Sequence, residues 1–214
     1  AAALSHPDKV PNCHKAIHTS EPLPSTMPQQ PSLPIGPKER SFIAKQEMFF
    51  VATAPMAADG LVNLSPKGVD GTFVVLDSQT VAYLDLWGSG IETTAHIREN
   101  GRLCLLFCSF DEDPKSLRLH GRGDIVEPDH MDFESLITHF PEMPGTRAII
   151  RLQVTRAEFS CGWGTPRYTF IGHRPQLQEI ANKMGPEAVA DATRKKNTSS
   201  IDGLPGTDFW SRSN

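Results

Sequence analysis

The sequence predicts a mainly β domain, built as an antiparallel barrel or sandwich with flanking helices. The β-type runs are short, and turn signals such as Asp59-Gly60 and Asp70-Gly71 separate them closely. Short strands joined by tight turns are typical of antiparallel sheets, whereas parallel sheets need long crossover connections. With 214 residues, the chain is long enough for one such domain with a real core.

The alternation of apolar and polar residues locates the strands. We expect them at residues 48–54, 61–65, 73–76, 80–86, 102–110, 117–126 and 147–159. Helical spacing predicts helices at residues 38–46, 129–140, 176–184 and 186–195. A further helix should begin after Ser89, which with Glu92 fits a capping box, and end near Asn100 with Gly101 as the left-handed cap.

The first 37 residues differ in composition from the rest. They hold eight of the eighteen prolines and few aromatic or β-branched residues. Such a segment buries too little apolar surface to offset its ordering entropy. We therefore expect a disordered or strap-like arm at residues 1–37, followed by a single domain at 38–214 that ends in a helical extension.

Charge and apolar patterning exclude several classes of protein. The net charge of −4 and a pI near 6.1 provide no basic field for nucleic acid or an anionic membrane. The longest apolar runs are strand-sized, far below the roughly 20 residues that span a bilayer. The sequence contains neither an HExxH motif nor paired CxxC motifs, which are the usual signs of a metal site. We expect a soluble, cytoplasmic protein without a bound metal.

Two stretches carry residues suited to an anionic ligand. In Ser65-Pro66-Lys67-Gly68, the lysine follows a rigid proline and precedes a glycine that allows close backbone approach. Lys67 is either a point charge for a phosphate or a solvated lysine in a turn. In Gly88-Ser89-Gly90, the turn exposes the first amides of a helix, and Thr93 and Thr94 add hydroxyl groups. The alternative is an ordinary capped helix, in which Glu92 already uses the positive helix end.

Two other residues are candidates with an equally simple structural interpretation. Arg118 lies on the strand face that also carries His120 and Arg122, and it either meets the same anion or forms surface salt bridges. Trp163, in a glycine-rich turn, either stacks on a ring system or anchors a core or interface. His96 is expected on the surface of its helix. No pattern of nucleophile and base suggests covalent catalysis.

Taken together, several segments resemble one known family. FFVATAP, GLVNLSPKG, TVAYLDLWGSGIETTAHIRENGRLCLLF, LRLHGRG, SCGWGTPRY and SIDGLPG are similar, in order and spacing, to pyridoxamine 5'-phosphate oxidase-like proteins with the FMN-binding split-barrel fold. The similarity extends from about Phe42 to Gly206. It is greatest for a fungal and bacterial branch that is distinct from the true oxidases of vitamin B6 metabolism.

The resemblance implies a six-stranded antiparallel split β-barrel, a homodimer and FMN in a groove between the subunits. It places the FMN contacts on the strand at residues 63–68 and on the turn and helix start at residues 88–94. Arg118 and Trp163, the two candidates introduced above, complete the expected set. The implied cofactor-binding residues are Asn63, Ser65, Pro66, Lys67, Gly68, Ser89, Gly90, Thr93, Thr94, Arg118 and Trp163. The implied activity is FMN-dependent oxidation and reduction of a small substrate or a reduced nicotinamide, with no catalytic side chain required.

The chain also departs from the true oxidases. They carry a basic pair at the helix start, where this chain has Ile91-Glu92-Thr93. Arg167 and His173 are present near the end but outside the substrate motif of those enzymes. Phosphate would then be neutralised by Lys67, Arg118 or Arg102, and pyridoxamine phosphate is not implied as the substrate.

Two further hypotheses follow from these departures. One is a dimeric split-barrel protein with weak or no flavin binding and no redox activity, which Glu92 at the phosphate end favours. The other is a haem-binding or haem-degrading relative, for which His96, His120 and His173 are the candidate axial ligands. The sequence does not distinguish FMN from a deazaflavin such as F420.

Overall fold

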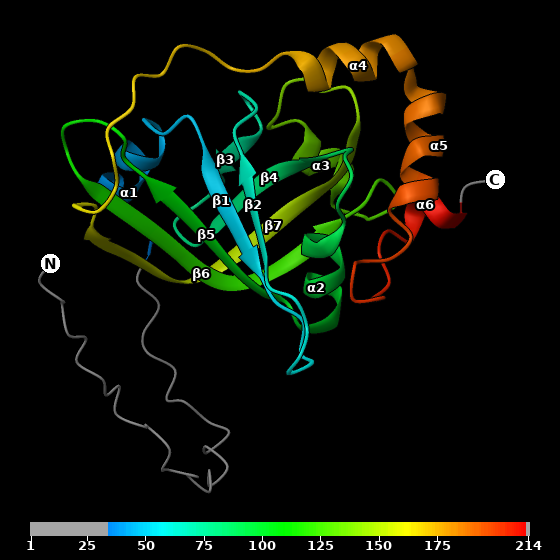
Figure 1. The fold of residues 1–214 in the computed structure, drawn as a ribbon, viewed down its shortest axis with the longest axis horizontal. Coiled ribbons are helices and arrows are strands. Elements are labelled where there is room, and N and C mark those ends of the chain that lie inside the picture. Colours follow the sequence, from blue (N-terminus) through cyan, green and yellow to red (C-terminus); the bar gives the residue numbers. More distant parts are fainter. Residues whose placement is uncertain (1–33, 213–214) are drawn as a thin grey trace, which may run out of the picture. The chain divides into compact units, whose positions relative to one another are not determined.

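Seven antiparallel strands form one curled sheet in the computed structural model, which describes residues 34–212 (Figure 1). The strands are β1 (Phe49–Thr53), β2 (Asn63–Lys67), β3 (Phe73–Val75), β4 (Thr80–Leu86), β5 (Arg102–Cys108), β6 (Lys115–Val126) and β7 (Thr146–Cys161). Their order across the sheet is β2-β1-β5-β6-β7-β4-β3. All seven predicted runs are confirmed. The count of six strands implied by the resemblance is wrong, because the short β3 pairs with β4 as an additional edge strand.

Six helices within the described residues flank this sheet. They are α1 (Pro37–Ile43), α2 (Glu92–Asn100), α3 (Phe133–Ile137), α4 (Gln176–Met184), α5 (Pro186–Lys196) and α6 (Phe209–Arg212). The helix predicted at residues 129–140 shortens to α3, because local turns occupy its first part: His130 N donates to the Glu127 carbonyl, and Asp132 N donates to His130 Nδ1.

The curl of the sheet brings its two ends together. β2 is one edge and β4 lies next to the other edge, yet Lys67 at the end of β2 places its Nζ 3.6 Å from Oδ1 of Asp85 in β4. Inside the curl, the rings of Phe49, Phe73 and Phe107 pack with centroids 5.1–5.5 Å apart and join β1, β3 and β5. Aromatic packing of this kind adds to the free energy from burial alone.

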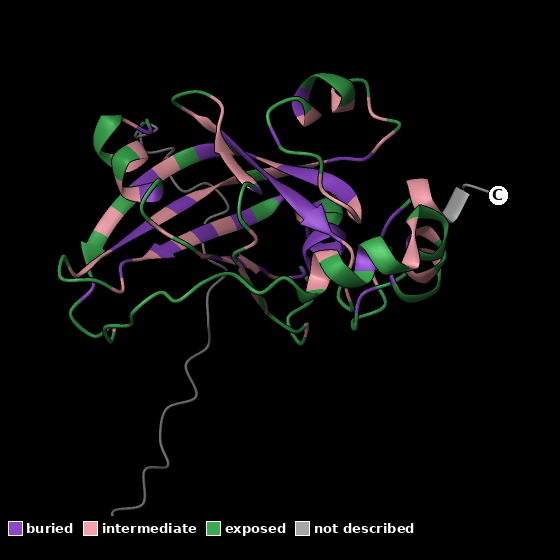
Figure 2. Ribbon diagram, turned by 90° about the horizontal axis from the view of Figure 1, so that it is seen from above, coloured by how far each residue is buried: buried purple, intermediate pink, exposed green. Residues whose placement is uncertain are grey.

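Two apolar clusters lie on opposite faces of the strands. Val81, Tyr83 and Leu152 belong to the cluster inside the curl, whereas Leu84 and Ile149 pack outside against Leu136 and its neighbours. Figure 2 shows the resulting alternation as bands of buried and less buried residues along the strands. Alternate side chains along a strand therefore pack into one apolar cluster or the other. Because both of its faces are covered, β4 is buried along nearly its whole length.

The predicted arm and the C-terminal extension meet this domain differently. Residues 1–33 of the arm lie outside the described part of the chain, but Ile35 is 2% exposed and belongs to the inner core. At the other end, Trp210 of α6 donates its indole N–H to the Arg147 carbonyl at 3.0 Å. No helix within residues 34–212 is long and apolar enough to cross a membrane.

Candidate functional site

A cavity of about 510 Å³ lies between the end of β2, the end of β4 and the start of α2. Eight of the eleven predicted binding residues line it: Ser65, Pro66, Lys67, Gly68, Ser89, Gly90, Thr93 and Thr94. These residues come from two segments more than twenty positions apart, and the curl of the sheet places them around one space. Asn63 does not line the cavity but donates hydrogen bonds from Nδ2 to Thr93 and accepts one from Ser65.

Lys67 supplies a cation at the cavity wall. Its side chain is 27% exposed, and its only ion pair among the described residues is the 3.6 Å contact with Asp85. At that length the contact is an ionic attraction without a short hydrogen bond. The ammonium group therefore keeps donor capacity for a ligand, and the interpretation of Lys67 as an isolated, solvated turn residue is not supported.

Beneath Lys67 lies a buried ion pair that the sequence analysis did not single out. Asp85 is 2% exposed, and its Oδ2 accepts from Arg147 Nε at 3.1 Å and Nη2 at 2.9 Å. Arg147 also lines the cavity. Charged residues are seldom fully buried without a partner. Asp85 stands inside the otherwise apolar run of β4, and this position could have indicated a buried ion pair from the sequence.

The turn at residues 88–90 is tied to the protein through its carbonyl groups. Arg147 Nη1 donates to the Gly90 carbonyl at 2.9 Å, and Asn197 Nδ2 donates to the Gly88 carbonyl at 3.3 Å. Asn197 is fully buried and accepts from the same Arg147 Nη1 at 2.8 Å. The amides of residues 88–90 donate to no acceptor in the described part of the chain. No local pattern predicts this role for Asn197, which is 109 residues from Gly88.

The start of α2 differs from the prediction. The N-cap is Ile91 without a side-chain cap, so Ser89 is not the cap and Glu92 occupies the first helical position. The bonds to the Gly88 and Gly90 carbonyls hold the preceding turn out of helical geometry, which moves the start by two residues. Glu92 Oε1 accepts from the Ile201 amide at 3.4 Å. One carboxylate oxygen therefore faces the C-terminal segment, although Glu92 still lines the cavity. The predicted end of the helix is confirmed, with Gly101 at φ 70°.

Arg118 and Trp163 lie away from the cavity in this chain. Arg118 Nη1 donates to Ser160 Oγ at 2.8 Å on the outer face of β6 and β7. Trp163 is 83% exposed. Neither contributes to the lining, so their proposed contact with a cofactor has no support within one subunit.

The three histidines considered as haem ligands are also placed elsewhere. His96 is fully buried, and its predicted surface position is wrong. His120 Nε2 lies 4.0 Å from Cys104 Sγ in an outer groove, and His173 Nδ1 lies 2.9 Å from the Gly68 carbonyl beside a neighbouring hollow. Because no histidine of residues 34–212 lines the cavity, axial ligation of a haem there is not supported. Within residues 34–212, no cluster of three or more His, Cys, Asp or Glu side chains could hold a metal ion.

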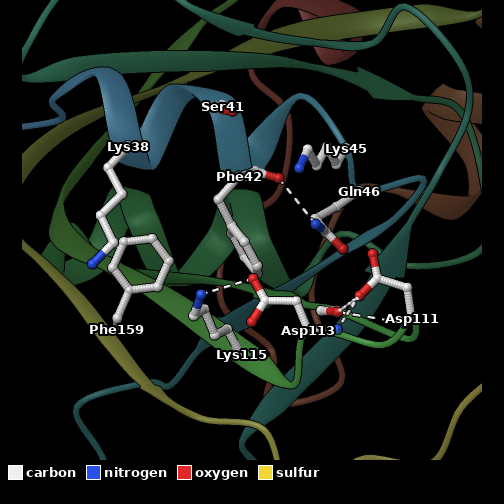
Figure 3. Close-up of a pocket in the computed structure, with 10 residues that line it drawn as sticks. Lys38, Ser41, Phe42, Lys45, Gln46, Asp111, Asp113, Lys115 and Phe159 are labelled. Carbon is white, nitrogen blue, oxygen red and sulfur yellow. Dashed lines mark hydrogen bonds and ion pairs between the residues drawn. The ribbon is translucent and has the colours of Figure 1, made fainter.

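A smaller hollow of about 190 Å³ lies beside α1 and contains none of the predicted site residues (Figure 3). Several of its charged side chains have partners. Lys115 pairs with Asp113 at 2.7 Å, and Lys38 lies over the Phe159 ring at 4.7 Å from its centroid. This hollow therefore presents three lysines and two aspartates beside two aromatic side chains, and the helix start that borders the larger cavity is not part of it.

The donors around the larger cavity fit a phosphate-bearing ligand. They combine the Lys67 ammonium group, the amides of residues 88–90 and the first amides of α2, where the positive end of the helix dipole favours an anion. A volume of about 510 Å³ lies in the range of small-molecule sites. The opposing charges are Asp85 and Glu92. Asp85 is already paired with Arg147, which leaves Glu92 as the main carboxylate that disfavours a phosphate.

Comparison with known proteins assigns the family. Residues 35–161 match the sequence profile of the pyridoxamine 5'-phosphate oxidase family. The chain is 34% identical over 183 residues to the pyridoxamine 5'-phosphate oxidase family protein ustO of Aspergillus flavus, covering 78% of this chain and 73% of that protein. This chain therefore belongs to the pyridoxamine 5'-phosphate oxidase family.

Solved structures include more distant likenesses. HupZ of Group A Streptococcus is 19% identical with a TM-score of 0.47, covering 64% of this chain and 99% of the other. An FMN-binding protein of Syntrophomonas wolfei is 14% identical with a TM-score of 0.41, covering 56% and 82%. An FAD-binding protein of Mesorhizobium loti is 14% identical with a TM-score of 0.43, covering 59% and 95%.

Proposed function

We propose that this protein is an FMN-dependent oxidoreductase that transfers a hydride to or from a small substrate or a reduced nicotinamide. The observation that carries the proposal is the convergence of Lys67 and the turn at residues 88–90 on one cavity. Membership of the pyridoxamine 5'-phosphate oxidase family supports it independently. A bound flavin supplies the hydride chemistry itself, while the protein supplies binding, orientation and electrostatics.

The residues of the chain have separate tasks in this proposal. Lys67 attracts the phosphate, and the amides of residues 88–90 and of the α2 start orient it. The Asp85–Arg147 pair is positioned to hold the wall rigid, since Arg147 joins β4, the turn and Asn197. Hydroxyl groups of Ser65, Thr93 and Thr94 contact the ligand as donors or acceptors.

An absorption spectrum of the purified protein tests the proposal. We expect a flavin band, FMN as the species released on denaturation and identified by mass spectrometry, and binding of added FMN by quenching of its fluorescence. Reduction of the bound flavin by NADH or NADPH would support the oxidoreductase activity. Colourless protein that leaves added FMN fluorescent would contradict the cofactor assignment.

One observation favours a second candidate, a split-barrel protein with weak or no flavin binding and no redox activity. The charges nearest the cavity cancel formally, since Lys67 and Arg147 face Asp85 and Glu92. Such a balance weakens attraction for a phosphate compared with the basic pair of the true oxidases. Protein that binds FMN weakly or not at all, and shows no flavin reduction by NADH, NADPH or a panel of small reductants, would favour this candidate.

We also propose that the protein forms a homodimer with the cavity near the subunit interface. Several apolar side chains are exposed around β2, next to the cavity-lining residues of the same strand: Met56, Leu61, Val62 and Leu64 are 54–74% exposed. Large exposed apolar groups gathered on one region are typical of an interaction surface. Sedimentation velocity on the wild type and on Leu64→Glu tests this: the wild type should sediment as a dimer and the variant should shift toward monomer, whereas a monomeric wild type would contradict it.

A further inference from the structure

A chain of hydrogen-bonded side chains runs from the cavity wall into the interior. Ser65 Oγ donates to Asn63 Oδ1 at 2.8 Å, and Asn63 Nδ2 donates to both Thr93 Oγ1 and Thr53 Oγ1 at 3.0 Å. Thr53 Oγ1 lies 2.9 Å from His96 Nδ1. Two members, Ser65 and Thr93, line the cavity, whereas Thr53 and His96 are buried behind it. The chain therefore connects a fully buried imidazole with two groups that face a ligand.

The far end of the chain is a carboxylate. Asp202 Oδ2 lies 3.8 Å from His96 Nε2, which is buried and has no hydrogen-bond partner among the residues that the structure describes. Both Asp202 oxygens also accept from the Leu61 amide at 3.2 and 3.3 Å, so the carboxylate is held in place. A carboxylate attracts an N–H group and repels a nitrogen lone pair, most strongly where water is excluded. Asp202 therefore favours the His96 tautomer that carries its proton on Nε2, and Nδ1 is then an acceptor.

This tautomer determines the direction of every hydrogen bond in the chain. Thr53 must donate its hydroxyl hydrogen to His96 Nδ1, so its oxygen accepts from the Asn63 amide nitrogen. The same amide nitrogen then occupies an acceptor site of Thr93, and the Asn63 oxygen accepts from Ser65. In the opposite tautomer, Nδ1–H would donate to Thr53, whose hydroxyl hydrogen could then go to Asn63, so the orientation of the Asn63 amide would no longer be fixed.

We propose that the His96–Asp202 pair is a positioning device that makes Thr93 a hydrogen-bond donor and Ser65 an acceptor toward the cavity. Because Asn63 already donates to Thr93, the Thr93 hydroxyl hydrogen is left for an oxygen of the ligand. Because Ser65 already donates to Asn63, its lone pairs are left for an N–H or O–H group of the ligand. The assignment to FMN rests on the proposed function, whereas the polarity of the wall is a property of the chain alone.

The tautomer of His96 is measured directly by nitrogen NMR on protein labelled with ¹⁵N-histidine and freed of ligand. The His96 signals are assigned by their loss in His96→Gln. We expect a neutral ring with its proton on Nε2, and a mixture of tautomers in Asp202→Asn. Asp59→Asn, in an exposed turn before β2, is the matched control and should leave the signals unchanged. A ring protonated on Nδ1, a doubly protonated ring, or an Asp202→Asn spectrum identical to the wild type would overturn the proposal.

Binding of FMN tests the consequence for the ligand. Thr53→Val removes the link between His96 and Asn63 without altering charge or touching the cavity, and we expect roughly tenfold weaker binding because the Asn63 amide is no longer oriented. Thr93→Val should weaken binding by a similar factor. Thr155→Val, whose hydroxyl donates to the His120 carbonyl on the outer groove, is the control and should bind normally.

The outcomes separate the two proposals. If the wild type binds FMN and both Thr53→Val and Thr93→Val bind it equally well, the positioning role is wrong while the cofactor assignment stands. If the wild type does not bind FMN at all, the cofactor assignment fails, and the tautomer spectra alone decide whether the pair fixes the polarity of the wall.

Discussion

Asp85 and Arg147 form a two-point hydrogen-bonded ion pair beneath the cavity, with both residues at most 5% exposed. β4 and β7 are neighbouring antiparallel strands, and the pair lies where their register shifts between Asp85 and Leu86. The irregular register brings Arg147 to the end of β4, where it also reaches the Gly90 carbonyl. A local irregularity in the sheet thus couples the core to the turn that lines the cavity.

Removal of the Arg147 charge should be strongly destabilising. Arg147→Met leaves Asp85 buried without its partner and frees the Gly90 carbonyl, and a buried pair broken in this way costs about 3–5 kcal/mol. Urea denaturation followed by circular dichroism measures the change in the free energy of unfolding. Lys115→Met is the matched control, because its surface pair with Asp113 is worth at most about 1 kcal/mol. Equal losses in the two variants would contradict a special role for the buried pair.

Lys67 should matter for the phosphate and not for the flavin ring. Lys67→Met removes a charge-assisted contact of about 1.5–3 kcal/mol, which corresponds to roughly a tenfold to hundredfold weaker FMN affinity. Riboflavin, which lacks the phosphate, should bind the wild type and the variant alike. Titration of both ligands by fluorescence quenching makes the comparison. A variant that loses riboflavin as strongly as FMN would place Lys67 at the ring or in the fold instead.

Glu92 should oppose FMN while supporting its helix. Glu92→Gln keeps an oxygen that can accept from the Ile201 amide but removes a negative charge from the cavity. We expect FMN to bind more tightly by a factor of about five, together with a loss of about 0.3–1 kcal/mol in stability, because an acidic residue in the first helical turn is favourable. Parallel FMN titration and thermal unfolding measure both effects. Unchanged or weaker FMN binding would mean that the carboxylate already points away from the ligand.

Much of the fold was predictable because it depends on local periodicity. The alternation along β7 and the helical spacing up to the Gly101 cap are set by side chains close in sequence. The two segments of the cavity were also predictable from local sequence. Lys67 lies between a proline and a glycine, and two glycines form the turn at residues 88–90. Their meeting in one cavity was not a local property, since it requires the curl of the whole sheet.

The remainder depends on contacts between distant parts of the chain. Asn197 reaches Gly88 across 109 positions, and no pattern around it indicates that contact. His96 is a polar residue inside a helix, which suggests a helix surface, but β1 and the segment that carries Asp202 cover it. The start of α2 was mispredicted for the same reason, because Arg147 and Asn197 hold the turn before it.

A side chain at Gly206 should disturb the cavity from behind. A Cβ there would lie 2.1 Å from the backbone oxygen of Asn197 and 3.0 Å from Ile91, so Gly206→Ala must displace backbone at a cost of about 1–3 kcal/mol. FMN affinity should fall as well, because Asn197 holds the Gly88 carbonyl. Gly164→Ala is the control, since its Cβ would meet nothing within 4 Å. Chemical denaturation and FMN titration on both variants decide; a Gly206→Ala protein as stable as Gly164→Ala would contradict this packing.

His120 should make the folded state sensitive to mild acid. Burial, followed by the nearby Arg118 charge, lowers the pKa of His120 below its ordinary value of about 6.5. The unfolded chain therefore binds more protons in this range, and the stability contribution, complete above the ordinary pKa, is lost as the pH falls toward the folded-state pKa. The free energy of unfolding of His120→Gln should vary less between about pH 7.5 and 5 than that of the wild type. His139→Gln, at an exposed position, is the control and should follow the wild type. If His120→Gln and the wild type show the same slope against pH, His120 is not the group responsible.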